Sequence, residues 1–419
     1  MAKNRKDSRG RVLHTGEYEE IKASGSYYVY KYQDVTGKRS RVSAKTLPEL
    51  REKEKALNAD MFDGLKTGRE RDKTVADMTR IYLDTKINLK GTTASNYEYM
   101  AQKFIIESPL GKQKVKTVTK SDIQKYYGDL LRNGMKSSTL ENIHTILHPV
   151  FQRAIDDGYI RINPTQGVMT EIKKSELWVK TKRPALTIEE QAAFIDYVKA
   201  SPIYDHWGVL FTFLLGTGCR IGEAIGLCWE DVDFKENVIR VQHNLVYRWI
   251  YSADDVQDGD SKVKWIMSTP KTEDGKREIP MLSEVRSVLL AIKEEQTHSG
   301  NVWRIPAPVE INGEKYNLVF RNRDGGALLP SCINRAIKRI VRDYNRDKTA
   351  DMVTLPEFSV HQLRHTFCTR LCENSSNVKA IQEIMGHADI TTTMNVYADA
   401  TRQAKKNTLE AMEGKVKIS

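Results

Sequence analysis

The chain has none of the short motifs with which phosphoryl-transfer and hydrolytic enzymes commonly bind nucleotides or metal ions. It contains no G-x-x-x-x-G-K-[ST] loop, no D-x-[DN]-x-[DN]-G loop and no H-E-x-x-H sequence. It also lacks an obvious carboxylate cluster for a pair of magnesium ions. A chain of this kind that transferred a phosphoryl group would have to stabilise charge with Arg, Lys and His side chains, so we expect no cofactor and no metal.

Long apolar runs and cysteine frameworks are missing as well. The basic N-terminus has no apolar segment of a secretory signal, and the longest apolar run, at 208–216, is too short to cross a bilayer. Cys368 and Cys372 lie one helical turn apart, but no second pair completes a zinc site. His144 and His148 are likewise without a third ligand. We therefore expect reduced, packed cysteines, packing or surface histidines, and a soluble intracellular protein with no membrane partner.

Positive charge is concentrated in the first part of the chain. The formal net charge is +11, with +6 in residues 1–73, +6 in residues 74–182 and −1 in residues 183–419. One explanation is a solvated basic face. We favour a front part that binds a phosphate backbone, while the rear part carries a different activity.

The hydrophobic periodicity predicts a multidomain, mainly α-helical fold with small β-sheets. Residues 17–45 alternate as strands and are followed by a helix, and helical patterns fill residues 74–158. In the rear part, residues 237–251 and 262–272 have the pattern of one long hairpin. We therefore predict three domains: a three-stranded sheet plus helix over residues 1–68, a helical domain over residues 74–175, and a mixed α+β domain over residues 183–419.

Arg39 and Arg41 are candidates for DNA contact in the first domain. They share one face of a predicted strand, on the side opposite Val42. A small sheet can lie in the major groove of DNA and contact base edges. Solvated charge on a strand at the sheet edge is an equally good explanation.

The first candidate catalytic motif is TGCRIGEAIGL at 217–227. Arg220 and Glu223 lie three residues apart at the start of a helix, so a carboxylate can orient the guanidinium. Taken alone, this pattern is that of an ordinary ion pair at a helix terminus.

The second motif is HQLRHTFCTRL at 361–371. His361, Arg364 and His365 share one face of a helix and lie near its N-terminus. Imidazole and guanidinium groups at such a position favour an anion, and an arginine can hold two phosphoryl oxygens at once.

A lysine is the third candidate. Lys271 lies where a strand enters a Gly-containing turn, from which it could donate a proton to a leaving oxygen. Lys262, Lys264 and Lys276 are rivals that the sequence does not separate from it.

The last candidates are the MGH sequence at 385–387, which contains His387, and Tyr397. Asp389 is predicted to cap a short helix that carries Tyr397, and residues 399–414 are predicted to form an amphipathic tail helix. A phenol can attack phosphorus and store the ester without ATP, provided that cations are already in place.

Together these motifs, in this order and spacing, resemble the tyrosine recombinase (phage integrase) family, most closely the integrases of conjugative transposons. The resemblance covers nearly the whole chain. It implies an arm-type DNA-binding domain over residues 1–68, a SAM-like core-binding domain over residues 74–175 and a catalytic domain with a C-terminal tail over residues 183–419. It also implies a site-specific recombinase that works through a Holliday junction to integrate and excise a mobile element, in the cytoplasm of a bacterium and in association with the nucleoid.

The family's functional residues fall on matching positions. The resemblance implies that Tyr397 forms a 3′-phosphotyrosine bond and frees a 5′-hydroxyl. Arg220 and Arg364 would bind the non-bridging oxygens of the scissile phosphate, and Lys271 would be the general acid.

Four further residues support this set. By resemblance, His361 would assist proton transfer or hydrogen-bond the phosphate, and His387 would contact a phosphate oxygen. Glu223 matches the family's supporting acidic position, and His365 is expected to be structural.

The implied partners are double-stranded DNA, with core and arm sites, and a homotetramer on paired sites. The tail would be exchanged between protomers, with packing on its own domain as the alternative, and an excisionase or DNA-bending protein is a candidate helper. Two other functions are considered: a type IB topoisomerase, which would not need the N-terminal sheet, and a DNA-binding regulator, which would not need the intact set of site residues.

Overall fold

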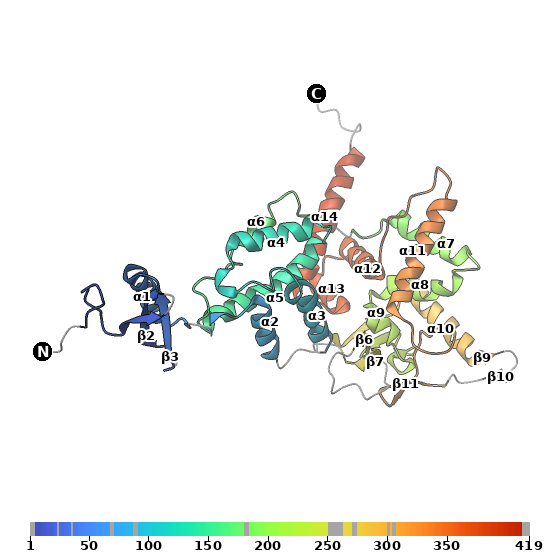
Figure 1. The fold of residues 1–419 in the computed structure, drawn as a ribbon. Helices are drawn as coiled ribbons and strands as arrows, with labels where there is room; N and C mark the ends of the chain where they lie inside the picture. Colours follow the sequence, from blue (N-terminus) through green and yellow to red (C-terminus); the bar gives the residue numbers. More distant parts are fainter. Residues whose placement is uncertain are drawn as a thin grey trace, which may run out of the picture. The chain divides into compact units, whose positions relative to one another are not determined.

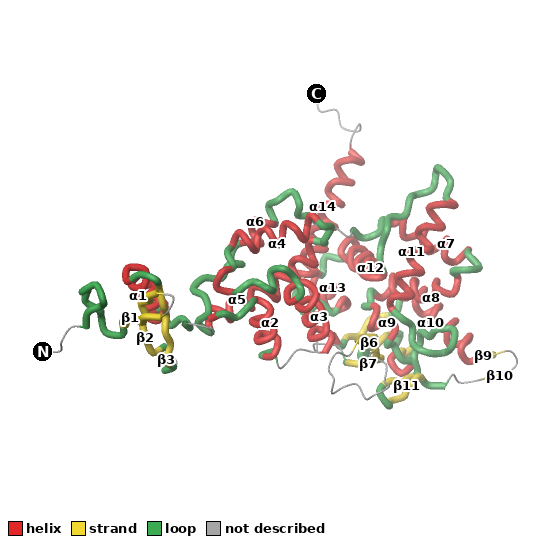
Figure 2. Tube along the Cα trace, viewed as in Figure 1, coloured by secondary structure: helices red, strands yellow, loops and turns green. Residues whose placement is uncertain are grey.

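The computed structural model divides into two compact units, residues 1–181 and residues 182–419 (Figures 1 and 2). None of the helices in the described residues is long and apolar enough to cross a membrane. The structure describes residues 5–22, 25–34, 37–67, 71–86, 91–179, 184–249, 263–269, 275–299, 302–303 and 307–412.

The first unit opens with an antiparallel sheet of order β1-β2-β3 and a helix. One face of the sheet packs against the helix through a small core of Tyr28, Ala44, Leu47 and Leu50. Thr46 caps the helix by accepting a hydrogen bond from the Glu49 backbone N–H. The elements are β1 (Glu17–Lys22), β2 (Gly25–Gln33), β3 (Arg39–Ala44) and α1 (Leu47–Phe62).

The rest of the first unit is helical and has its own apolar core. Thr74 and Thr119 begin two of its helices with capping boxes. His144 Nδ1 lies 3.0 Å from the Tyr127 hydroxyl and forms part of this packed region. The elements are α2 (Val75–Asp84), α3 (Gly91–Ala101), the π-helical turn η2 (Gln102–Ile106), the 3₁₀ turn η3 (Val115–Thr117), α4 (Lys120–Arg132), α5 (Ser137–Asp156) and α6 (Val168–Ile172).

The second unit mixes helices with small antiparallel sheets, as the sequence predicts. Its core includes Phe194, whose ring packs on Phe211 and Phe358 at centroid distances of 5.2 and 5.0 Å. Its helices are α7 (Ile188–Ala200), α8 (Asp205–Thr217), α9 (Ile221–Ile225), the 3₁₀ turn η4 (Trp229–Asp231), α10 (Ser283–Thr297), α11 (Pro330–Asp347), α12 (Val360–Asn374), α13 (Val378–Met385) and α14 (Ile390–Met412).

Within the described residues, the strands of the second unit form four sheets. One has the order β4-β5-β8, and the others are the pairs β6-β7, β9-β10 and β11-β12. The strands are β4 (Val232–Asp233), β5 (Val238–Val241), β6 (Asn244–Trp249), β7 (Val263–Ser268), β8 (Arg277–Pro280), β9 (His298–Ser299), β10 (Val302–Trp303), β11 (Val309–Ile311) and β12 (Glu314–Tyr316).

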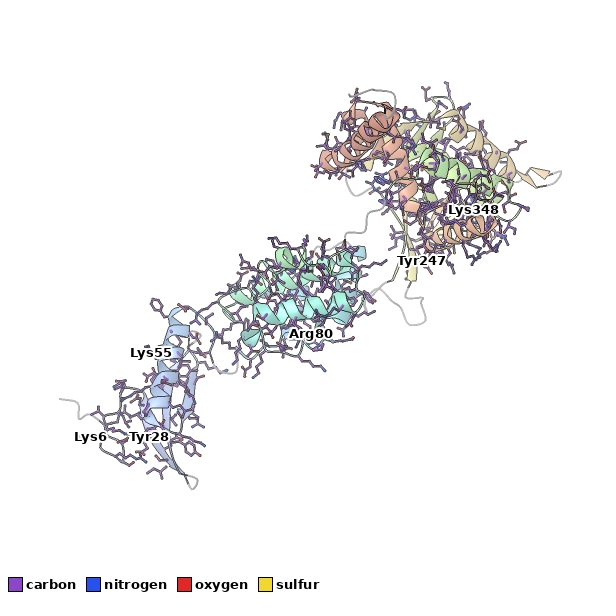
Figure 3. All side chains as sticks on the ribbon, turned by 90° about the horizontal axis from the view of Figure 1, so that it is seen from above. Lys6, Tyr28, Lys55, Arg80, Tyr247 and Lys348 are labelled. Atoms are coloured by element: carbon purple, nitrogen blue, oxygen red, sulfur yellow. The ribbon has the colours of Figure 1, made fainter. Side chains whose placement is uncertain are left out.

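The single strand predicted over residues 237–251 is wrong, because the chain divides there between two sheets. β5 pairs with β4 and β8. β6, which carries Tyr247 (Figure 3), pairs instead with β7. In this pair Tyr247 stands opposite Trp265. The chain changes sheet at His243, whose ring lies 2.7 Å from the Asp231 carboxylate. The alternation of apolar and polar residues in this segment gives no indication of this contact with η4.

The short helix predicted around Tyr397 is also wrong, because it continues into the predicted tail helix. α14 runs without a break from Ile390 to Met412. Asp389 precedes the first turn of α14 and caps it, as predicted. Its carboxylate accepts a hydrogen bond from the Thr391 backbone N–H at 2.8 Å. α14 packs with α12 and α13 (Figure 1). Cys368, Cys372 and Ala400 are buried in the core that these helices form.

Candidate active site

Arg220 is positioned by the junction between two helices. α8 ends at Gly218, which is in the left-handed region at φ +61°, and Arg220 is the N-cap of α9. Its Nη1 donates to Glu223 Oε1 at 2.7 Å, and its backbone N–H donates to Glu223 Oε2 at 2.9 Å. The Arg220 side chain remains 42% exposed, so the guanidinium is held on one side and open on the other.

Arg364 lies on α12 and is only 4% exposed. α12 begins with a capping box between Ser359 and Gln362, which places Arg364 in its second turn. Nη1 of Arg364 donates to the Gly218 carbonyl at 2.6 Å, and Nη2 donates to the Met385 carbonyl. Burial, and then the nearby Arg220 charge, lower the pKa of Arg364 to about 10, so it stays a cation at neutral pH.

A third arginine, Arg277 on β8, completes the cluster and was not singled out from the sequence. Its side chain is 5% exposed, and Nη2 donates to Glu223 Oε2 at 2.8 Å. Nε donates to the Ile384 carbonyl at 2.7 Å. Glu223 and Ile384 are far away from Arg277 in the sequence, so no local spacing could have revealed these two contacts.

The carboxyl end of α13 accepts a hydrogen bond from each of the three arginines. These carbonyl oxygens have no partner within the helix and carry the negative end of its dipole, so they suit cations. Arg277 donates to Ile384, Arg364 donates to Met385, and Arg220 donates to Gly386 at 2.9 Å.

Glu223 is the common acidic partner of two of these arginines. It is 4% exposed. Burial raises the pKa of its carboxyl group, but the hydrogen bond from Arg277 and the charges of Arg277 and Arg220 outweigh burial and lower it overall. The carboxylate is therefore ionised, and it fixes both guanidinium groups.

His387 follows α13 directly. Its Nδ1 lies 2.9 Å from the Thr393 hydroxyl on α14. Burial, followed by the charges of Arg364, Arg220 and Arg277, lowers the pKa of His387 to about 4. A hollow of about 510 Å³ lies beside it, lined in part by Lys276 and Lys379.

Tyr397 lies on α14 and is half-buried. It packs against the core that includes Phe367 and Met385, the residue whose carbonyl holds Arg364. His361 is exposed in the first turn of α12, and its charge acts on His387.

Two other candidates have different positions. His365 is half-buried, and burial lowers its pKa, opposed by the Asp399 charge on α14. Lys271 and its rival Lys262 lie outside the described residues. Lys264 is on β7, and Lys276 directly precedes β8.

Arg39 and Arg41 are placed on the exposed face of β3, away from the small core. Arg41 stands opposite Lys31 of β2, and Arg39 stands opposite Gln33. These four residues line a hollow of about 610 Å³ on the sheet.

We expect the His387 imidazole to stay neutral in the folded protein until the pH falls to about 4. The unfolded chain takes up this proton near 6.5, so it binds more protons below that pH, and stability should fall as the pH drops from about 6.5 to about 4. NMR of ¹³C-labelled histidines should show two late-titrating signals, because burial also lowers the pKa of His144 to about 4. His387→Gln should remove one of them, and His144→Gln should remove the other. A His387 signal that titrates near 6.5 would contradict the burial argument.

Gly386→Ala should destabilise the protein and impair the site. Gly386 has φ +61°, and a Cβ there would lie 3.0 Å from Arg277 Nη1. The left-handed conformation alone costs a non-glycine residue about 1–2 kcal/mol. Gly313→Ala is the matched control, because Gly313 has φ +80° and no atom within 4 Å of an added Cβ. Thermal unfolding of both variants should show the larger loss for Gly386→Ala, and equal losses would mean that the contact with Arg277 is unimportant.

Family models match three parts of the chain. The model of the phage integrase family matches residues 184–404. The model of the DNA binding domain of tn916 integrase matches residues 1–61, and that of the phage integrase N-terminal SAM-like domain matches residues 74–131.

Relatives and solved structures agree with these matches. The transposase from transposon Tn916 of Enterococcus faecalis is 30% identical, over 96% of this chain and 95% of its own length. The Tn1549 transposon integrase in complex with a circular intermediate DNA is 27% identical, with a TM-score of 0.67 over 80% of this chain and 99% of that one. A lambda integrase tetramer bound to a Holliday junction shares the fold at 17% identity, with a TM-score of 0.52 over 91% and 95% of the two chains. The chain belongs to the phage integrase family and is a tyrosine recombinase of the conjugative-transposon type.

Proposed function

We propose that Tyr397 is the nucleophile of a site-specific integrase that inserts and excises a mobile element. Its phenolic oxygen forms a bond with the scissile phosphorus while the bond to the 5′ oxygen breaks. The phenol loses a proton and the 5′ oxygen gains one, so a 3′-phosphotyrosine ester and a 5′-hydroxyl result. The reverse attack by a 5′-hydroxyl of another strand rejoins the DNA and releases Tyr397.

The observation that carries this proposal is the seating of Arg220 and Arg364. Both guanidinium groups are anchored to carbonyls at the end of α13 or α8, and Arg220 keeps 42% of its side chain exposed. Cations that are already in place need no rearrangement as charge develops on phosphorus. We therefore assign the two non-bridging oxygens of the phosphate to Arg220 and Arg364.

Three residues complete the assignment. Lys271 is the general acid for the 5′ oxygen. His361, exposed at the start of α12, assists proton transfer or hydrogen-bonds the phosphate. His387 contacts a phosphate oxygen and is neutral before DNA binds, since its pKa is lowered to about 4 by burial and the arginine charges.

The three parts of the chain have separate roles in this proposal. Residues 1–68 bind arm sites, residues 74–175 bind the core site, and residues 183–419 carry out the chemistry. Two paired duplexes present four strands to be cut, and each needs one Tyr397, so the active assembly is a homotetramer. Ala400 is buried in its own unit, and the part of α14 beyond it is the segment proposed to be exchanged between protomers.

A nicked suicide duplex of the element's core site tests the function. The enzyme should leave a covalent protein–DNA band that resists denaturant, because the short fragment that carries the freed 5′-hydroxyl diffuses away and cannot attack the phosphotyrosine ester. A regulator would give a gel shift and no covalent band, and a topoisomerase would cut with little site preference and form no junctions. Either result would overturn the proposal.

Arg39→Ala and Arg41→Ala should weaken binding to arm-site DNA by about 1–3 kcal/mol each if they contact base edges. Both side chains lie on the exposed sheet face, next to Lys31. Lys53→Ala is the control, because Lys53 lies on α1 and pairs with Glu49. Fluorescence anisotropy on arm and core duplexes should show a loss confined to the arm duplex. No loss on the arm duplex would indicate solvated charge instead, and equal losses on both duplexes would indicate contact with the phosphate backbone alone.

A further inference from the structure

Arg277 is the one arginine of the cluster without a role in the proposed chemistry. Its side chain is 5% exposed, compared with 42% for Arg220, although both bind the same carboxylate. Burial alone does not distinguish it, because Arg364 is only 4% exposed. However, each guanidinium nitrogen of Arg277 already faces an acceptor within the protein, so Arg277 is poorly placed to contact a phosphate directly. Its effect on the reaction must therefore pass through its neighbours.

The hydrogen bonds of Arg277 fix its position. Nη2 is bound to Glu223 and Nε to Ile384, and Nη1 lies 3.4 Å from the Gly275 carbonyl. The guanidinium also lies close against Gly386, where a Cβ would be 3.0 Å from Nη1. Arg277 thus joins β8 to the carboxyl end of α13.

Glu223 depends on Arg277 for half of its side-chain ion pairing. Oε1 of Glu223 receives Arg220 Nη1, while Oε2 receives Arg277 Nη2 and the Arg220 backbone N–H. A buried carboxylate that loses one of two cations is strongly disfavoured in its ionised form. Once protonated, Glu223 would hold Arg220 less firmly.

We propose that Arg277 is a positioning residue of the recombinase site. By pairing with Glu223 it keeps that carboxylate ionised, and the carboxylate in turn fixes the Arg220 guanidinium against the scissile phosphate. Through the Ile384 carbonyl it also ties this pair to the end of α13 that holds Arg364. This inference rests on the proposed function of Arg220 and Arg364.

The test compares Arg277→Met, Arg277→Lys and the double variant Glu223→Gln/Arg277→Met, with Arg240→Met as control. Arg240 is matched because it lies on neighbouring β5 and pairs with Asp233 and Glu278 outside the site. Rates of covalent-complex formation on the suicide duplex are measured from pH 5 to pH 9, beside the affinity for an intact core duplex.

Arg277→Met should lower the cleavage rate by about 10²-fold, as expected for a misplaced catalytic group, and leave the affinity unchanged. Its rate should fall further as the pH drops, because Glu223 then gains a proton. The charges that face Glu223 in this variant are those of Arg220 and Arg364, and the Cys219 thiol is also nearby. The double variant should lack this pH step, and Arg277→Lys should recover part of the rate.

Two results would overturn the inference. One is a wild-type cleavage rate in Arg277→Met. The other is a loss of rate in Arg277→Met that is equal at every pH and that is no smaller in Arg277→Lys. If Arg277→Met fails to fold, the ion pair is tested by the midpoints of thermal unfolding of the double variant and of Glu223→Gln. The double variant removes the Arg277 cation together with its carboxylate partner, whereas Glu223→Gln leaves Arg277 buried without that partner. The double variant should then be more stable than Glu223→Gln, and a midpoint at or below that of Glu223→Gln would overturn the pairing. Absence of the covalent band in wild-type protein would instead refute the proposed function, and the midpoints would still test the ion pair.

Discussion

Tyr397→Phe should form no covalent protein–DNA complex on a suicide duplex, a loss of at least about 10⁴-fold in rate. Phenylalanine retains the ring that packs against the core of α12, α13 and α14, but it has no oxygen to attack phosphorus. The folded structure and the affinity for the core duplex should therefore remain unchanged. Denaturing gel electrophoresis and a gel shift on the same duplex measure the two quantities.

The matched control is Tyr197→Phe. Tyr197 is also a half-buried tyrosine on a helix of the same unit, and its hydroxyl donates to the Asp347 carboxylate at 3.2 Å. Its loss should leave the covalent band intact. A covalent band that persists in Tyr397→Phe would show that another residue is the nucleophile, and the assignment of α14 as the catalytic helix would fail.

Local parts of the site could be predicted because their causes are local. The Arg220–Glu223 pair follows from a three-residue spacing at a helix start, and the observed 2.7 Å contact agrees with it. The predicted cap at Asp389 is likewise observed, because its carboxylate accepts a hydrogen bond from the Thr391 backbone N–H. The mainly helical fold with small sheets is confirmed by the structure and by its likeness to the Tn1549 integrase.

The parts that could not be predicted depend on residues far apart in the chain. Arg277 is 54 residues from Glu223 and 107 from Ile384, so its sequence neighbourhood resembles that of an ordinary strand arginine. The change of sheet at His243 has the same origin, because β5 pairs with the distant strand β8 whereas β6 pairs with β7. The continuity of α14 is different, because residues 390–412 contain no Gly or Pro and the sequence itself allowed one long helix.

Arg364→Lys should lower the cleavage rate by about 10²–10³-fold while leaving salt-sensitive binding to the core duplex largely intact. Arg364 donates to Gly218 and Met385, which uses two of its five N–H groups and leaves others for a phosphate oxygen. A lysine keeps the charge but cannot hold both carbonyls and the phosphate in one plane. Arg364→Ala should abolish the covalent band and also leave the two carbonyls without these donors.

Arg370→Lys separates this effect from a general loss of helix packing. Arg370 lies on the same helix, donates to the Leu186 carbonyl at 2.6 Å and pairs with Glu373, but lies outside the arginine cluster. Its substitution should leave the cleavage rate near that of wild type. Most of the binding energy for DNA comes from many phosphate contacts, whereas the scissile phosphate needs Arg364 only as charge develops on it. If Arg364→Lys lowered the affinity for DNA by the same factor as the cleavage rate, Arg364 would be an ordinary contact with the DNA backbone. The binding of the scissile phosphate would then have to be assigned to other cations.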